Sequence, residues 1–185
     1  MSEQQIIQAI LNGDHSKFEL LVVKYQTMVL RTAMGFVHSK EDAEDLTQDI
    51  FIRAFQSLSS FQGNSEFPTW LYRITVNTSI NQLNRNKHRA FLQIAGDLLQ
   101  NIFNKETGDK NPHQELEQTE LDAAIRKAID SLPEKQRTAF VLSKYDDLTQ
   151  KEIAAIMQSS EGSVEQLIQR AKTNLQKKLK PLVGK

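Results

Sequence analysis

Cysteine is absent from this chain of 185 residues, and its absence excludes several classes of function. Without thiols there is no disulfide framework, no cysteine-ligated zinc finger and no thiol nucleophile. Long apolar runs are lacking too, since no stretch approaches the roughly 20 apolar residues of a membrane span. The polar start MSEQQ has neither the charged nor the apolar part of a signal peptide. We therefore expect a cytoplasmic protein with no membrane insertion.

Histidine is scarce, and the sequence does not gather its few copies into a reactive group. The four histidines are scattered at His15, His38, His88 and His113. No pair of carboxylates and no activated nucleophile stands out either. We therefore expect a protein that is not an enzyme and that uses no metal or other cofactor.

Net charge is also absent, because 23 basic residues balance 23 acidic ones. DNA-binding domains are usually basic overall, so the average argues against a nucleic-acid partner. The charges are nevertheless sorted into blocks. Residues 41–49 carry five acids and no base, whereas residues 71–91 and the tail from residue 166 carry bases and no acid. The sequence therefore predicts separate acidic and basic surfaces.

Apolar residues recur at helical spacing along nearly the whole chain, and the alternation typical of strands is hard to find. One such stripe consists of Ala43, Leu46, Ile50, Ala54 and Leu58. The 7 glycines and 4 prolines fall mostly where helices would end or turn. The sequence predicts an all-α fold.

Between about residues 91 and 119 the helical pattern gives way to NKETGDKNPHQELEQ, which mixes turn formers with polar residues. Residues 104–122 carry six acids and two lysines, a balance of minus four. Such a segment has little apolar surface to bury and is typical of a linker. We therefore predict two small helical domains, residues 1–90 and 120–185, joined by a flexible acidic linker over residues 91–119.

The second predicted domain has the pattern of a helix-turn-helix. Thr149 and Glu152 form a capping-box sequence at the start of a short helix, Gln158 and Ser159 turn the chain, and Ser160 can cap a second helix. Polar side chains of that second helix could reach base edges in a major groove, and backbone amides at its start could bind a phosphate. The candidates are Ser160, Gly162, Ser163, Glu165, Gln166, Gln169, Arg170 and Lys172. An ordinary helical hairpin with a solvated face is the alternative.

The stretch GNSEFPTWLYRITVN, residues 63–77, holds the only tryptophan and suggests a surface for single-stranded DNA. Pro68 suits the first turn of a helix, from which Trp70, Arg73 and Asn77 lie on one face. Aromatic planes, cations and amides serve stacked bases, phosphates and base edges respectively. A basic cluster continues beyond, at Arg85, Lys87 and Arg89. The alternative is that Trp70 and its neighbours are simply core.

The energies of base extraction and stacking make the first reading plausible. Extracting a base from a duplex costs a few kcal/mol, and stacking on an aromatic ring returns about 1 to 3 kcal/mol per base. A pocket with Phe61 or Trp70 and a few hydrogen bonds could therefore balance the cost of one or two flipped bases without ATP.

The segment DAEDLTQDIFIRAFQSL, residues 42–58, predicts an acidic helix with an apolar stripe on one side. Its remaining face presents Asp45, Gln48, Asp49 and Ile52. An exposed isoleucine among acids and amides is typical of a docking surface for a basic protein partner. A solvated helix face is the alternative. The acids would repel DNA, so DNA would bind elsewhere.

Four segments, taken together in their order and spacing, resemble the extracytoplasmic-function (ECF) sigma factors, the minimal two-domain branch of the sigma-70 superfamily. They are DAEDLTQDIFIRAFQSL, SFQGNSEFPTWLYRITVN, SLPEKQRTAFVLSKYDDLTQKEIAAIM and SEGSVEQLIQRAKTNLQKKL. The similarity covers about residues 10–90 and 130–182 and is greatest to the envelope-stress type. It implies an RNA polymerase sigma factor that binds core polymerase and directs promoter recognition, DNA melting and transcription initiation.

The resemblance also implies roles for individual residues. The acidic helix matches the segment that binds the clamp helices of the largest polymerase subunit, with contacts at Asp45, Gln48, Asp49, Ile52 and Arg53. The following segment matches the part that recognises and melts the minus-10 element, with Phe61, Asn64 and Ser65 in the loop that captures a flipped base. The full minus-10 set is Phe61, Asn64, Ser65, Trp70, Arg73, Asn77, Arg85, Lys87 and Arg89.

The second domain matches the part of the family that reads the minus-35 element, through the eight candidates named above. Within the second domain, the helices that precede the helix-turn-helix, around Arg137 to Lys144, would meet the flap of the second large polymerase subunit. The resemblance also implies an anti-sigma factor as a usual partner. Family members commonly carry a basic residue at the position of Glu165, and a glycine with an apolar residue at Gln158 and Ser159. Because an acidic side chain at residue 165 selects different nucleobase edges, the promoter sequence of the family cannot be carried over to this chain.

A conventional helix-turn-helix regulator, with a sensor or dimerisation domain as its first half, is the competing reading. Residues 42–58 would then need no face that combines acids with an isoleucine. Comigration with core polymerase separates the two, since a plain regulator does not comigrate.

Overall fold

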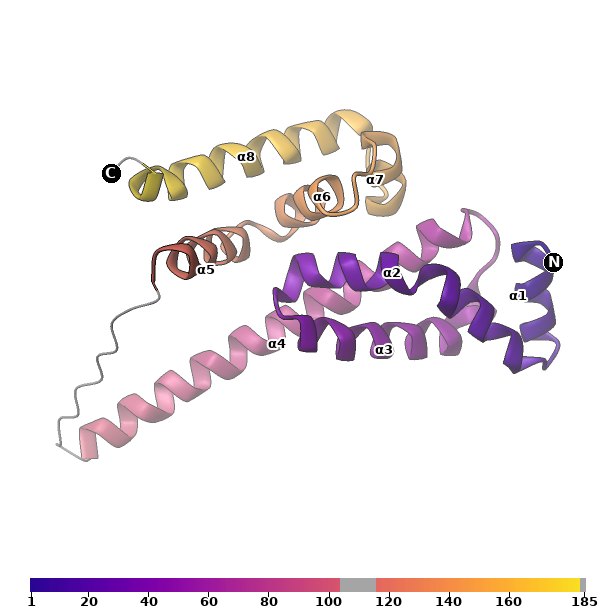
Figure 1. The fold of residues 1–185 in the computed structure, drawn as a ribbon, viewed down its shortest axis with the longest axis horizontal. Helices are drawn as coiled ribbons and strands as arrows, with labels where there is room; N and C mark the ends of the chain where they lie inside the picture. The colour runs from indigo at the N-terminus through magenta and orange to yellow at the C-terminus, as the bar shows by residue number, and fades with distance from the viewer. Residues whose placement is uncertain (104–115, 184–185) are drawn as a thin grey trace.

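The computed structural model describes residues 1–103 and 116–183, with side chains described over residues 1–86 and 121–181. Every regular element in these residues is helical, which confirms the all-α prediction. The first half contains two short 3-10 turns, at His15–Lys17 and Leu58–Ser60, and the helices α1 (Glu3–Leu11), α2 (Phe18–Val37), α3 (Lys40–Ser57) and α4 (Phe67–Phe103). The second half contains α5 (Leu116–Asp130), α6 (Glu134–Lys144), α7 (Gln150–Met157) and α8 (Glu161–Val183) (Figure 1).

Polar caps begin several of these helices at the positions that the sequence predicts. Thr149 and Glu152 form the expected capping box of α7, in which the Glu152 amide donates to Thr149 Oγ1 at 3.3 Å and the Thr149 amide donates to Glu152 Oε2 at 2.8 Å. The bonds from Thr149 stabilise the carboxylate and so lower the pKa of Glu152. Ser160 Oγ accepts from the Ser163 amide at 3.2 Å and caps α8. Each cap contributes about 1 kcal/mol.

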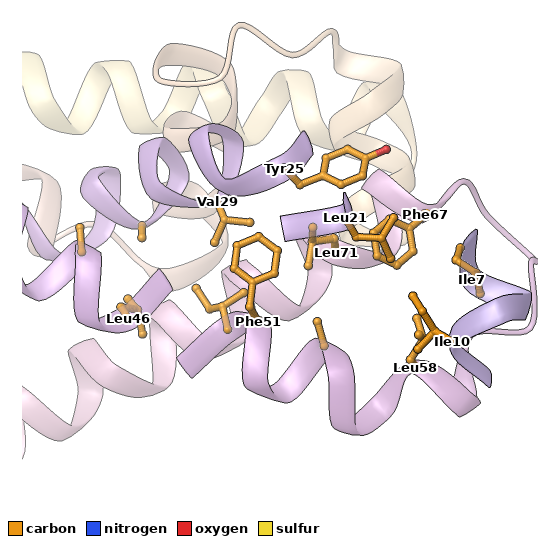
Figure 2. Packing of buried hydrophobic residues seen from close by; sticks show 14 residues of the cluster. Ile7, Ile10, Leu21, Tyr25, Val29, Leu46, Phe51, Leu58, Phe67 and Leu71 are labelled. Carbon is orange, nitrogen blue, oxygen red and sulfur yellow. The ribbon is translucent and has the colours of Figure 1, made fainter. Parts of the chain in front are cut away.

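The core of the first domain lies between α2, α3 and α4 (Figure 2). Leu21 and Val29 of α2, Ile50 of α3 and Leu71 of α4 are completely buried in it. Replacing such a leucine with alanine typically costs 2 to 5 kcal/mol, roughly. Helix α1 closes one end of this core with Ile7 and Ile10. The apolar stripe predicted for residues 43–58 is therefore buried, and the opposite side of α3 is left outside.

Helix α4 is longer than the sequence suggested. It continues to Phe103, past residue 90, where the first domain was expected to end and the linker to begin. Residues 91–103, FLQIAGDLLQNIF, carry apolar side chains at helical spacing, and the turn formers and acids begin only after Phe103. Helix α5 likewise starts at Leu116, inside the range assigned to the linker. Residues 104–115 lie outside the described residues.

The second domain lies against α2 and α4, on the side away from α3 (Figure 1). One buried cluster contains side chains from both halves, among them Phe36 of α2, Tyr72 and Val76 of α4, Val141 of α6 and Ile156 of α7. A separate cluster between α5, α6 and α8 belongs to the second domain alone. The sequence predicted two domains but gave no indication of an apolar contact between them.

The stretch His15–Val37, which contains α2, is the one candidate for a membrane span among the described residues, by length and composition. Leu21, Val29 and Phe36 of this stretch are completely buried within the protein itself, whereas Leu20 and Val23 are exposed. Central helices of soluble domains have this composition for the same reason, because their neighbours in the chain cover them.

Candidate functional site

The acidic helix α3 presents an uncovered face to solvent. All five side chains predicted to bind a protein partner are exposed there: Asp45, Gln48, Asp49, Ile52 and Arg53. Ile52 is 54% exposed, which is unusual for so apolar a side chain. Among the described residues, no ion pair engages Asp45 or Asp49. The face therefore combines two available carboxylates with an apolar anchor.

Three aromatic rings meet where the loop after α3 joins α4. The ring centre of Phe61 lies 5.4 Å from that of Trp70 and 5.6 Å from that of Phe67. Trp70 is partly buried against the core of the first domain, so it also serves the core role that was the alternative to base stacking. The loop residue Asn64 is exposed, and its Nδ2 donates to Gln62 Oε1 at 3.2 Å.

A cavity of about 740 Å³ opens beside these rings. Phe61 and Ser65 line one wall, and Ile7 of α1 and Tyr25 of α2 line the other. Pockets of this volume commonly hold one small organic ligand. No sequence pattern indicated that α1 takes part, since Ile7 and Ser65 are far apart in the chain.

A small network of polar groups fixes α1 beside this cavity. Glu3 accepts a hydrogen bond from Lys24 Nζ at 2.7 Å and another from the Tyr25 hydroxyl. The bond to Glu3 is the main reason that the pKa of Lys24 is raised above its ordinary value. Burial raises the pKa of Tyr25, and the bond to Glu3 adds to it.

Arg73 and Asn77 lie apart from this cavity, at the contact with the second domain. Arg73 Nη2 donates to the carbonyl oxygen of Ala155 at 2.7 Å, and its Nε donates to that of Ile156 at 3.3 Å. These carbonyls belong to the last turn of α7, where a helix has unsatisfied acceptors and partial negative charge. Arg73 and Asn77 line a second cavity, of about 370 Å³, together with Gln158. The structure thus divides the predicted minus-10 residues between two places.

The basic cluster at the end of the predicted minus-10 segment lies on α4. Arg85 is exposed, and no hydrogen bond or ion pair engages it among the described residues. Lys87 and Arg89 lie on the helical backbone of α4, and their side chains are outside the described residues.

Helices α7 and α8 form the predicted helix-turn-helix. Gln158 turns the chain with a left-handed backbone, φ 52°, which glycine adopts more readily. The apolar stripe of α8, which includes Val164 and Ile168, is buried. All eight polar candidates on the other side are exposed. A Cβ added at Gly162 would meet nothing within 4 Å, so the start of α8 is uncovered there, while the Ser163 amide is engaged by the cap at Ser160.

A groove of about 800 Å³ runs between α6 and α8. Its floor is apolar, with Phe140, Leu175 and Leu179, and lysines at residues 172, 177 and 180 surround it. The segment from Arg137 to Lys144 was expected to meet a protein partner, but much of it is core, including Arg137, Val141 and Leu142. Phe140 is the part of that segment that reaches the groove.

Asp146 joins the two domains and was not singled out from the sequence. Its side chain is fully buried and accepts hydrogen bonds from Arg31 Nε at 2.9 Å and from Thr32 Oγ1 at 2.8 Å. Burial raises the pKa of Asp146, and these two donors oppose the effect. Burial, with a contribution from Asp146, also raises the pKa of Tyr72 to about 12. More than 100 residues separate Asp146 from its partners, so no local pattern reveals the contact.

Comparison with known proteins places these surfaces in a family. Residues 21–89 match the model of Sigma-70 region 2, and residues 122–175 match that of Sigma-70, region 4. The chain is 36% identical to the ECF RNA polymerase sigma-E factor of Escherichia coli over 186 residues, which cover 99% of this chain and 97% of the relative. The chain belongs to the ECF branch of the sigma-70 family. It is a sigma factor, which binds core RNA polymerase and directs promoter recognition and transcription initiation.

Three further likenesses of this sigma factor concern one relative in sequence and two solved structures with a similar fold. It is 35% identical to the RNA polymerase sigma-H factor of Pseudomonas aeruginosa, over 98% of this chain and 95% of the relative. Its fold is similar to that of CnrH in complex with the cytosolic domain of CnrY, with a TM-score of 0.65, 23% identity and 97% of each chain covered. It is also similar to the sigma factor RpoE in complex with the anti-sigma factor NepR from Bartonella quintana, with a TM-score of 0.53, 24% identity and coverage of 88% and 96%.

The two family models place the surfaces of this sigma factor in different regions. Region 2 contains α2, α3 and the start of α4, and therefore the α3 face, the aromatic loop and Arg73. Region 4 contains most of α5, all of α6 and α7 and the first half of α8, and therefore the helix-turn-helix. Helix α1 lies outside both matches, although it forms one wall of the cavity beside the loop.

Proposed function

We propose that this sigma factor binds core polymerase through the α3 face, the minus-10 element through the loop and the start of α4, and the minus-35 element through α8. The observation that carries the proposal is the exposure of the α3 candidates and the α8 candidates on opposite sides of the molecule (Figure 1). Acids on one side and bases on the other suit a protein that must hold a protein partner and DNA at once.

The α3 face binds the clamp helices of the largest polymerase subunit in this proposal. Asp45 and Asp49 pair with basic side chains, and Ile52 supplies the apolar anchor. Burying an isoleucine completely yields about 1.5 to 3 kcal/mol, which makes Ile52 the larger contributor and the carboxylates the source of specificity. Gln48 and Arg53 complete the surface at its edge.

The loop between α3 and α4 captures a base of the opened minus-10 element. The Phe61 ring is already held against Phe67 and Trp70, so little entropy is lost when a base stacks on it. Asn64 and Ser65 offer polar groups to base edges, and the adjacent cavity has room for one nucleotide base. Arg73, Asn77 and the basic end of α4 serve the phosphates and the neighbouring bases.

Helix α8 enters the major groove of the minus-35 element with its amino-terminal half. Gln166 and Gln169 can read adenine, and Glu165 can accept from cytosine. Arg170 and Lys172 serve guanine or phosphates, and the Gly162 amide and the Ser163 hydroxyl bind a phosphate. The first domain ends with α4 in this proposal, and the second begins with α5.

Two protein contacts of the second domain complete the proposal. The groove between α6 and α8 receives an apolar segment of the polymerase flap, and its lysines favour an acidic rim on that partner. An anti-sigma factor restrains the protein, as the complexes of CnrH with CnrY and of RpoE with NepR support. The protein acts in the cytoplasm, where the polymerase is, by binding rather than by catalysis, and with no cofactor.

Reconstitution with purified core polymerase tests the proposal. Templates with randomised upstream sequence, transcribed by the reconstituted enzyme, should yield a promoter with two separated elements. Initiation on no template would overturn the proposal. Selection of a single element, insensitive to changes in the other, would contradict the division between the two domains.

A further inference from the structure

The cavity of about 740 Å³ beside the aromatic loop has one wall that neither family match covers. Helix α1 forms this wall with Ile7 and with the exposed glutamines Gln4 and Gln8, which are four residues apart and share a helix face. The wall is fixed to the first domain, because Ile7 and Ile10 are buried in its core. A base that stacks on Phe61 in this cavity would therefore meet α1 as well as the loop.

Three charged side chains line the cavity: the carboxylates of Glu3 and Glu66 and the ammonium group of Lys24. The ammonium group is already paired, since Lys24 Nζ donates to Glu3 Oε2 at 2.7 Å. The Tyr25 hydroxyl donates to the same oxygen, and Lys24 Nζ lies 5.0 Å from the centroid of the Tyr25 ring. Glu3 and Lys24 thus compensate each other, and Glu66 determines the net charge of the cavity.

Glu66 has no hydrogen bond or ion pair through its carboxylate among the described residues. It stands directly before α4, where the positive end of the helix dipole favours a negative charge. A carboxylate only accepts hydrogen bonds, whereas the amides of Gln4 and Gln8 can either donate or accept. The amides can therefore adapt to a ligand, and Glu66 cannot. Acceptors consequently prevail among the free polar groups of this cavity.

The four bases of DNA differ in what they present to such acceptors. Adenine, cytosine and guanine each carry an exocyclic amino group, which donates hydrogen bonds. Thymine has no amino group and presents carbonyl oxygens and a methyl group instead. A carbonyl oxygen that faces a carboxylate is repelled by it, and both groups are left without a donor. An enzyme or binding protein that flips a base reads its pairing edge, which is where these differences lie.

We propose that α1 and Glu66 together choose the captured base, and that the cavity accepts a base with an exocyclic amino group and rejects thymine. This inference rests on the proposed function, because it takes the loop to capture a base of the minus-10 element. Gln4 and Gln8 complete the hydrogen bonds of the accepted base, and Glu66 excludes thymine. Helix α1 is thereby part of the DNA-reading surface, although it lies outside the match to Sigma-70 region 2.

The variant Glu66→Gln tests the exclusion of thymine, since it removes the charge and keeps the shape of an exposed side chain. The templates carry a minus-10 element opened by mismatches, with each of the four bases placed in turn at every position of one strand. With the unmodified holoenzyme we expect one position at which thymine binds about tenfold more weakly than an amino-bearing base. Glu66→Gln should remove most of this difference, because its amide can donate to a thymine carbonyl. Competition binding measures the four affinities.

The double variant Gln4→Ala with Gln8→Ala tests the part played by α1. It should weaken binding of the amino-bearing base at the same position by about tenfold and leave binding of thymine nearly unchanged. Alanine favours the helix, and Ile7 and Ile10 still hold α1 in the core. A displaced α1 would instead weaken all four bases alike, so the pattern of losses separates reading of the base from support of the loop.

Two matched controls change the same kinds of side chain outside the cavity. Glu19→Gln removes a carboxylate and Gln26→Ala removes an amide, both at exposed positions of α2 that do not line the cavity. Neither should alter the preference among the four bases. Both proteins are compared as holoenzymes with the same core polymerase and the same opened templates.

The two levels of the argument fail in different ways. If the holoenzyme prefers particular bases in the opened minus-10 element, but Glu66→Gln leaves every thymine penalty intact or no position disfavours thymine, the inference is overturned and the proposed function stands. A uniform loss over all four bases in the α1 double variant would likewise overturn the role of α1. If the unmodified protein initiates on no template with core polymerase, the proposed function fails, and the inference fails with it.

Discussion

Two faces of the first domain, both assigned to partners, differ in what covers them. The α3 face carries five exposed side chains, and Ile52 among them is 54% exposed. At the start of α4, in contrast, Arg73 donates hydrogen bonds to backbone carbonyl oxygens of α7, and Asn77 lines a cavity shared with the second domain. The α3 face is uncovered, whereas at the start of α4 the second domain engages Arg73 and leaves Asn77 exposed.

Under the proposed function, Arg73 is therefore less available to its partner than the residues of the α3 face are. The loop that contains Asn64 shares one property with each face. Asn64 is exposed, as the α3 residues are, but the loop is assigned to DNA, as Arg73 is.

The largest effect is expected on the open face. Asp49→Lys should weaken binding to core polymerase by about 100-fold, since it places like charges together at the interface. Titration of labelled sigma factor with core enzyme measures the affinity. Glu44→Lys makes the same charge change on α3, about 110° around the helix from the centre of the face, and should have little effect. Equal losses of affinity in both variants would show that the net charge of α3, and not the position of the charge on this face, determines binding to core polymerase.

A smaller effect is expected from α8, the helix proposed to read the minus-35 element. Arg170→Ala should reduce the affinity of the holoenzyme for the minus-35 element by about tenfold if the Arg170 guanidinium contacts a nucleobase. A contact to phosphate would instead weaken all sequences alike and lower the salt slope by about one. Lys178→Ala, on a distant turn of α8, is the matched control. Unchanged affinity and salt dependence for Arg170→Ala would remove this residue from the interface.

The loop and the start of α4 can be compared through two exposed asparagines. Asn64→Ala and Asn77→Ala each remove one amide, and each should reduce melting by about fivefold, the equivalent of one hydrogen bond, while closed complexes still form. Permanganate reactivity of unpaired thymines measures the melting. Ser59→Ala, at an exposed position before the loop, should have no effect. Normal melting with both asparagine variants would contradict the assignment of this region to the separated strand.

The smallest effect concerns stability rather than binding. Gln158→Gly should stabilise the second domain by about 1 kcal/mol, because Gln158 holds a left-handed backbone that costs other residues roughly this amount. Denaturant unfolding monitored by helical circular dichroism measures the change. Lys151→Gly, inside α7, should shift stability by a similar amount in the opposite direction. A loss of stability in both variants would mean that the turn is not strained.

Local patterns predicted the helices and their caps well, as Thr149 with Glu152 and the turn at Gln158 illustrate. They also placed the α3 candidates together, because residues three and four apart share a helix face. Helix α4 extends to Phe103, into the range predicted as linker, and residues 91–103 have apolar residues at helical spacing before the turn formers begin. The contact between the domains was not predicted.

That contact connects residues more than 80 positions apart, such as Arg73 and Ala155, and such pairs leave no local pattern. Gly35, where an added Cβ would lie 2.5 Å from Val141, stands two residues before the end of α2 at Val37. Because glycine is also common near helix ends, it did not reveal the contact from the sequence.

Arg73 recognises the second domain through the main chain. The acceptors are backbone oxygens of Ala155 and Ile156, which any amino acid at those positions would supply. The exposed side chains of the helix-turn-helix can consequently change during evolution, and the preferred DNA sequence can change with them, while the hydrogen bonds from Arg73 are kept. The attachment of the two domains and the choice of a DNA sequence therefore depend on different atoms of the same helix-turn-helix, main chain for the first and side chains for the second.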